Sequence, residues 1–118
     1  MVKGEAIVLE TFKRSLKIPG LKIVYGTDAV AGAHGHNGEE FIARIQQGGM
    51  DPMAALISAT SLSARSLNLQ NAIGSLAPGL QADIIAMDGN PLTDPTAVRR
   101  VVFVMKGGTI FRNAVPSP

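Results

Sequence analysis

Three side chains capable of catalysis or metal binding lie between positions 28 and 36. Asp28 follows the apolar run at residues 21–25, and His34 and His36 lie in the glycine-rich loop that comes next. A carboxylate at the exit of a buried strand, followed by glycines and histidines, is where α/β enzymes place catalytic and metal-binding groups. Because an ionised carboxylate is costly to bury alone, this position favours a metal, a cation or several N–H donors beside Asp28. Thr-Asp pairs are also common turn and helix caps, so a purely structural role is the alternative.

The elements that must position these residues resemble half of a repeating α/β unit. Residues 5–17 predict an amphipathic helix that Pro19-Gly20 ends. Its apolar stripe consists of Leu9, Phe12 and Leu16. Residues 21–25 predict a strand buried on both faces, as in a parallel sheet, because its apolar residues hardly alternate with polar ones. A helix, a short turn, a buried strand and a functional loop in this order predict the α/β class.

Helix-start signals follow the loop. Asn37 can cap a helix that begins after it, and Glu40 can reach back to the backbone of the cap, as in a capping box. Asp51-Pro52 predicts a second start, since proline at the first helical position loses no hydrogen bond. The pattern predicts a break in this second helical region near Thr60-Ser61.

The character of the chain changes at about residue 73. Residues 82–87 predict a strand, and Asp88-Gly89-Asn90-Pro91 predicts a turn. Asp94-Pro95 predicts one helical turn, and residues 101–111 predict a hairpin that turns at Gly107-Gly108. The second part is therefore expected to be rich in β-structure.

Composition excludes several classes of protein. Eleven Lys and Arg against nine Asp and Glu give a net charge of +2, with four Phe, one Tyr and no Trp. The basic residues are scattered, apart from Lys13, Arg14 and Lys17, so nucleic-acid binding has little support. The absence of cysteine excludes disulfides, thiol catalysis and thiolate zinc sites. No apolar run approaches the roughly 18 residues of a membrane span. Because the N-terminus also lacks a signal-peptide pattern, a cytoplasmic location is expected.

Taken in order, short motifs along the chain resemble the C-terminal end of the metal-dependent amidohydrolase superfamily. The imidazolonepropionase and prolidase-like branch is the most similar. The motifs are Gly26-Thr27-Asp28-Ala29, His34-Gly35, Asn37, Glu40-Phe41, Gly49-Met50, Pro52, Ala55-Leu56, Ala59-Thr60, Ile73-Gly74-Ser75-Leu76, Pro78-Gly79, Ala82-Asp83 and Gly89-Asn90-Pro91-Leu92. They cover nearly the whole chain, and their order carries the resemblance better than any one of them.

The resemblance implies a (β/α)8 barrel whose chain begins and ends in a small β-sandwich. Residues 21–25 would be the eighth barrel strand, with Asp28 at its C-terminal rim. Residues 1–72 would form the end of the barrel, with a helix, strand 8 and the following helices. Residues 73–118 would form the C-terminal part of the small β domain. The expected fold is therefore a partial one.

The resemblance also implies a reaction, the hydrolysis of a C–N bond in an amide, a peptide or a cyclic amide. One or two divalent ions, usually zinc, would activate a water molecule and polarise the carbonyl group. Asp28 matches the family aspartate that binds metal and takes a proton from that water. His34 matches a loop histidine assigned to substrate contact. The family's metal-binding H-x-H pair follows the first barrel strand, so His36 is expected to be a variable residue despite the spacing His34-Gly35-His36.

Most of the family's metal ligands have no counterpart here. A complete barrel takes about 250 residues, and Asp28 alone cannot hold a catalytic zinc. The chain is therefore expected to be a fragment that is inactive in isolation. A non-catalytic α/β interaction module is the alternative, and unpaired strand edges at residues 101–111 would favour its self-association. Phosphate binding by the loop at residues 32–38 has weak support, because it lacks both a Walker lysine and a G-x-G-x-x-G spacing.

Overall fold

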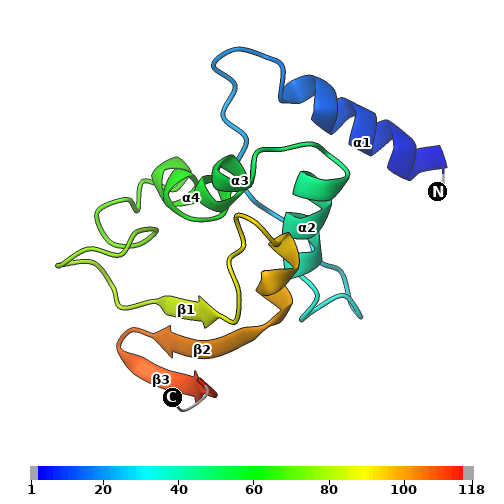
Figure 1. Cartoon of the computed structure of the whole chain (residues 1–118). Coiled ribbons are helices and arrows are strands. Elements are labelled where there is room, and N and C mark those ends of the chain that lie inside the picture. The colour runs from blue at the N-terminus through cyan, green and yellow to red at the C-terminus, as the bar shows by residue number, and fades with distance from the viewer. Residues whose placement is uncertain (1–2, 116–118) are drawn as a thin grey trace.

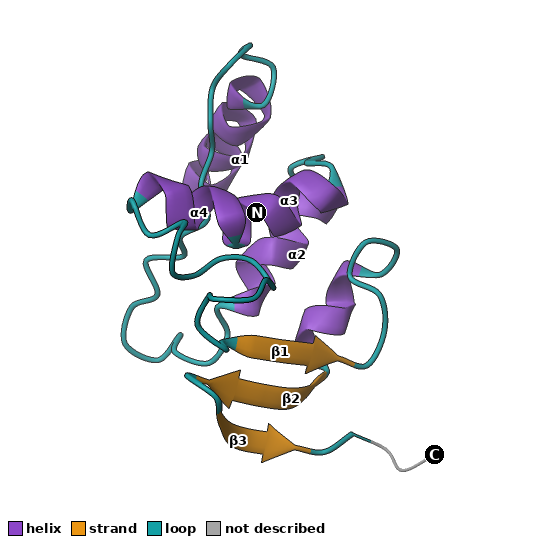
Figure 2. Cartoon of the chain, turned by 90° about the vertical axis from the view of Figure 1, so that its left-hand side faces the viewer, coloured by secondary structure: helices purple, strands orange, loops and turns teal. Residues whose placement is uncertain are grey.

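The computed structural model describes residues 3–115, in which the four α-helices precede the strands along the chain (Figure 1). The elements are α1 Lys3–Ser15, α2 Gly38–Gln46, α3 Pro52–Ala59, α4 Ser61–Ser66, β1 Ile84–Met87, the 3-10 helix η1 Pro95–Arg99, β2 Val101–Lys106 and β3 Thr109–Asn113. Figure 2 shows α2, α3 and α4 on one side of the three-stranded sheet and α1 extending away from it. No helix within the described residues is both long and apolar enough to cross a membrane.

The predicted amphipathic helix is confirmed as α1. Phe12 and Leu16 pack against the core, whereas Val8, one turn before Phe12, is 70% exposed. The end of α2 approaches Phe12 closely at Gly48. A Cβ atom at Gly48 would lie 2.5 Å from the Phe12 ring and 2.6 Å from the Arg44 carbonyl. A glycine is therefore required where α1 meets the end of α2.

The prediction of a strand at residues 21–25 is wrong for the described chain. This segment has no assigned secondary structure and pairs with no strand of residues 3–115. Its backbone instead makes a hydrogen bond to a helix, since the Tyr25 amide donates to the Ser58 carbonyl of α3 at 3.1 Å. Burial on both faces is also wrong, since Val24 is 38% exposed while Ile23 and Tyr25 are half-buried. Within the described residues, the segment contacts helices and lacks the ladder of hydrogen bonds that a strand makes.

The start of α2 differs from the predicted capping box. Asn37 lies at the cap position in helical conformation and makes no side-chain cap hydrogen bond. Glu40 accepts a hydrogen bond from Arg44 Nε at 2.8 Å instead of reaching back to Asn37. The reason is tertiary, because the Asn37 side chain binds the loop that precedes it and Arg44 supplies a charged partner one turn along the helix.

Local signals at the next helices are confirmed. The carboxylate of Asp51 accepts from the Ala54 amide at 2.9 Å and caps α3, which begins at Pro52. The expected break separates α3 from α4 at Thr60. The core that these helices share is small. Its buried members are Phe41, Met50 and Ala55.

The C-terminal part forms an antiparallel sheet in the order β1-β2-β3, and the predicted hairpin is confirmed. Gly107 and Gly108 have φ values of 54° and 82°, as a two-residue hairpin turn requires. The Gly107 amide donates to Asp83 Oδ1 at 2.8 Å, which ties this turn to the start of β1. Every residue of β3 is exposed and β3 lies at an edge of the sheet. Self-association through this hairpin stays a prediction.

The η1 helix connects the sheet to the helical part. Ala97 is fully buried, and Arg99 Nε donates to Glu39 Oε1 of α2 at 2.7 Å. This hydrogen bond from Arg99 holds the pKa of the Glu39 carboxyl below its usual value. The proposed boundary between residues 72 and 73 stays a prediction.

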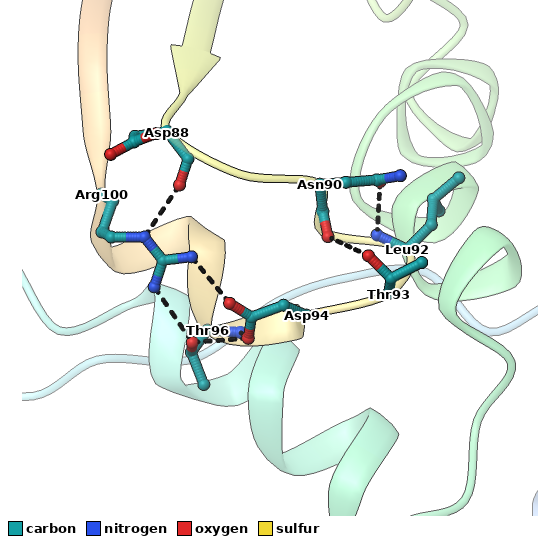
Figure 3. Close-up of polar contacts among 7 residues, drawn as sticks. All are labelled: Asp88, Asn90, Leu92, Thr93, Asp94, Thr96 and Arg100. Carbon is teal, nitrogen blue, oxygen red and sulfur yellow. Dashed lines mark hydrogen bonds and ion pairs between the residues drawn. The ribbon is translucent and has the colours of Figure 1, made fainter.

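A polar network surrounds the connection between β1 and η1 (Figure 3). Arg100 donates to the backbone carbonyl of Asp88 at 2.8 Å and to Asp94 Oδ2 at 2.7 Å. Asp94 Oδ1 also accepts from the Thr96 hydroxyl at 2.6 Å and the Thr96 amide at 3.0 Å. The hydrogen bonds from Thr96 and Arg100 lower the pKa of Asp94 from 3.8 to about 2. The Gly89-Asn90-Pro91-Leu92 motif therefore lies in a structural turn, where Asn90 Oδ1 accepts from the Leu92 amide at 3.0 Å.

Asp94→Asn is expected to destabilise the chain at neutral pH and to have little effect near pH 2. The carboxyl pKa is lower in the folded chain, so its charge stabilises the fold above pH 3.8 and this stabilisation is lost as pH falls towards about 2. Urea unfolding of both proteins between pH 7 and pH 2 measures the difference. Asp88→Asn is the matched control, because Asp88 contacts Arg100 through its backbone. A destabilisation that is independent of pH would contradict the assignment.

Candidate functional site

Asp28 ends the extended segment and begins the glycine-rich loop. Its side chain is exposed, and its backbone has a φ of 46°. Aspartate is one of the few residues other than glycine that adopts this left-handed conformation without a large cost. Such backbone geometry occurs preferentially at functional sites, where the surrounding structure imposes it. The structure thus places the predicted carboxylate in a special local conformation that opens to solvent.

The loop that contains Asp28 is closed at its base by Asn37. The Asn37 Nδ2 group donates to Thr27 Oγ1 at 3.0 Å, and the Tyr25 hydroxyl donates to the Asn37 carbonyl. Asn37 Oδ1 also accepts from the Gly35 amide at 3.2 Å. Since Thr27 precedes Asp28 directly, these hydrogen bonds fix both ends of the loop beside the carboxylate.

Arg44 of α2 binds the backbone that leads to Asp28. Its Nη1 donates to the Val24 carbonyl at 3.0 Å, and its Nη2 makes a longer hydrogen bond of 3.4 Å to the Gly26 carbonyl. The same side chain pairs with Glu40 at 2.8 Å. Sequence reasoning missed this contact, because the carbonyls lie about twenty positions earlier in the chain. The only local signal was the spacing of Glu40 and Arg44, four residues apart.

Tyr25 is fixed from a second side by α3 and α4. Its amide donates to the Ser58 carbonyl at 3.1 Å and lies 3.3 Å from the Ser63 hydroxyl. The Ser63 hydroxyl donates in turn to the Ser58 carbonyl at 2.6 Å. Burial, with a smaller contribution from the charge of Glu40, raises the pKa of the Tyr25 hydroxyl above 10.0. The hydroxyl therefore keeps the proton that it donates to Asn37.

The family model for the amidohydrolase family matches residues 7–111. This chain belongs to the amidohydrolase family. The match includes the extended segment, the Asp28 loop, all the helices after it and most of the sheet. The resemblance that the ordered motifs predicted is thereby confirmed.

Curated relatives and solved structures of other proteins support this family assignment. The chain is 33% identical over 108 residues to ochratoxinase from Aspergillus niger, a match that covers 88% of the chain and 22% of that protein. The crystal structure of a Xaa-Pro dipeptidase with methionine bound in the active site superimposes with a TM-score of 0.84 and 36% identity, over 90% of this chain and 26% of the other. A prolidase complexed with N-methylphosphonate-L-proline gives a TM-score of 0.77 at 32% identity, over 89% and 26%.

The chain thus spans about a quarter of the proteins that it matches. The matched proteins are amidohydrolases of the TIM-barrel type, which confirms the predicted fold class. Within that fold class, the extended segment at residues 21–25 lacks strand partners among the described residues, as noted above.

The amidohydrolase family implies a divalent metal, and the described residues do not form a complete site for one. No group of three or more His, Asp or Glu side chains able to hold a metal ion occurs within residues 3–115. His34 and His36 are exposed and lie in the same loop as Asp28. The exposed carboxylate of Asp28 fits the role of a single oxygen ligand, and further ligands would have to come from outside the described residues.

Proposed function

We propose that this chain forms part of a metal-dependent amidohydrolase that cleaves a C–N bond in an amide, a peptide or a cyclic amide. In this proposal Asp28 is a metal ligand and the general base. The observation that supports it most is the position of Asp28, exposed and left-handed at the mouth of a loop whose ends are fixed by hydrogen bonds. The similarity to a Xaa-Pro dipeptidase and to ochratoxinase supports the class of bond.

Asp28 would take a proton from the attacking water and later deliver it to the leaving amine. A carboxylate suits both steps, provided that it lies within hydrogen-bond reach of the water and then of the nitrogen. A divalent metal such as zinc, when bound, lowers the pKa of a water molecule. The fixed loop keeps the carboxylate facing solvent, where a substrate can reach it. His34, exposed in the same loop, would contact the substrate.

The proposal is tested on the native protein that contains this chain, expressed from its natural reading frame. Xaa-Pro dipeptides, N-acyl amino acids and a cyclic amide serve as substrates for an assay of hydrolysis. We expect hydrolysis of at least one class, its loss after a chelator removes the metal, and its return when zinc is added. Metal content is measured beside each assay.

Two controls make the result decisive. The 118-residue chain alone, with zinc, is expected to be inactive, because Asp28 supplies only one ligand. Hydrolysis that persists after the metal content has fallen to zero would contradict metal dependence. A native protein that hydrolyses none of the three substrate classes would contradict the proposed function.

A further inference from the structure

The guanidinium group of Arg44 is fixed on every side. Its central carbon lies 5.0 Å from the centroid of the Tyr25 ring and 5.5 Å from that of Phe12, within the range of cation–π contacts. Its side chain is only 10% exposed and also pairs with Glu40. Its three nitrogen atoms have defined acceptors, and its central carbon lies over two aromatic rings.

Besides the Glu40 carboxylate, the acceptors of Arg44 are two backbone carbonyls. They belong to Val24 and Gly26, the residues on either side of Tyr25. Gly26 lies two positions before Asp28, and a glycine there has more backbone freedom than any other residue. Without a partner for its carbonyl, Gly26 would act as a hinge immediately before the left-handed turn at Asp28.

We propose that Arg44 is a positioning residue for Asp28. It fixes the backbone at residues 24–26 and so determines where the Asp28 carboxylate enters its loop. This inference rests on the proposed function of Asp28. Arg44 acts through the backbone and does not itself touch the reacting atoms. A displacement of about 1 Å in a catalytic group can cost about 100-fold in rate.

The chemistry of arginine is required at this position. A planar fork can bind two carbonyls at once while it stacks on an aromatic ring, whereas a lysine ammonium is a single point charge. Arg44→Lys is therefore expected to keep the pair with Glu40 but to lose one carbonyl contact. Arg44→Met loses all the hydrogen bonds and keeps a side chain of similar length.

The first experiment is native-state hydrogen exchange on the protein that contains this chain. In Arg44→Met we expect the Tyr25 amide, which donates to the Ser58 carbonyl, to exchange at least about tenfold faster, with a smaller change in Arg44→Lys. The Ala55 amide, which donates to the Asp51 carbonyl, should keep its rate. Arg65→Met is the matched control, since Arg65 is an exposed arginine on α4. Unchanged exchange at the Tyr25 amide, or an equal acceleration at Ala55, would overturn the positioning role.

The second experiment separates kcat from KM in the active protein. Loss of positioning predicts a fall in kcat of about 10- to 100-fold in Arg44→Met with KM within about threefold, and partial rescue in Arg44→Lys. Unchanged kcat per folded molecule would overturn the inference. An inactive wild-type protein would contradict the proposed function instead, and hydrogen exchange then still decides whether Arg44 fixes the Asp28 backbone.

Discussion

Asp28→Asn is expected to lower kcat for C–N bond hydrolysis by about 10³-fold, because an amide cannot accept the proton of the attacking water. The substitution preserves the size of the side chain. Asparagine also tolerates the left-handed backbone that Asp28 adopts with a φ of 46°, so the fold should be unchanged. The measurement is steady-state kinetics of the native protein on the substrate class that it hydrolyses, with metal content determined in parallel.

The matched control for this substitution is Asp88→Asn. Asp88 is also an exposed aspartate near the end of an extended segment, and it lies in the connection between β1 and η1. It should retain wild-type kcat. Asp28→Asn that keeps kcat within about tenfold of wild type would show that Asp28 is not the general base. A loss of bound metal together with activity would support both of the proposed roles of Asp28.

Much of the fold could be predicted from the sequence wherever a feature depends on neighbouring residues. The cap at Asp51, the break at Thr60 and the glycine turn at Gly107-Gly108 all follow from local chemistry, and the structure confirms each. The apolar stripe of α1 was also predicted, because helical periodicity shows directly in the order of the residues. These features depend on atoms within a few positions of one another.

The errors lie where distant residues compete for a partner. Asn37 is a residue type that often caps helices, but its side chain donates a hydrogen bond to Thr27, ten positions earlier. Residues 21–25 have the composition of a buried strand, yet pairing requires another strand beside them, and the described chain supplies helices there. Local pattern cannot tell which element will supply the hydrogen-bond partners of such a segment.

In the candidate site, too, some residues could be predicted from the sequence and others could not. The family motifs pointed to Asp28 because residue type and order are sequence properties. The residues that fix the Asp28 backbone were not found, since Arg44 and Ser58 are ordinary helix residues until the fold brings them to residues 24–26. The carboxylate could be found from the sequence, whereas the arginine that contacts the backbone leading to it could be found only from the tertiary structure.

Phe41→Ala is expected to be the most destabilising core substitution considered, with a loss of about 3–5 kcal/mol in the free energy of unfolding. Phe41 is 4% exposed and belongs to the small buried cluster with Met50 and Ala55. Within the described residues few other large side chains are buried, so few neighbours could move in to fill the cavity that the substitution leaves. A domain is stable by only about 5–15 kcal/mol, so this loss removes a large part of the stability of the fold.

Urea unfolding of the wild-type protein and of Phe41→Ala measures this loss, and Phe111→Ala is the matched control. Phe111 lies on β3 and is 69% exposed, so its removal should change the free energy of unfolding by less than about 0.5 kcal/mol. Equal effects of the two substitutions would contradict the assignment of the core.

The substitution of Phe41 also affects the candidate site, because Phe41 and Arg44 lie on the same helix α2. A loosened α2 would release the carbonyls of Val24 and Gly26 together. Phe41→Ala should therefore accelerate exchange both at the Tyr25 amide and in the core, unlike Arg44→Met.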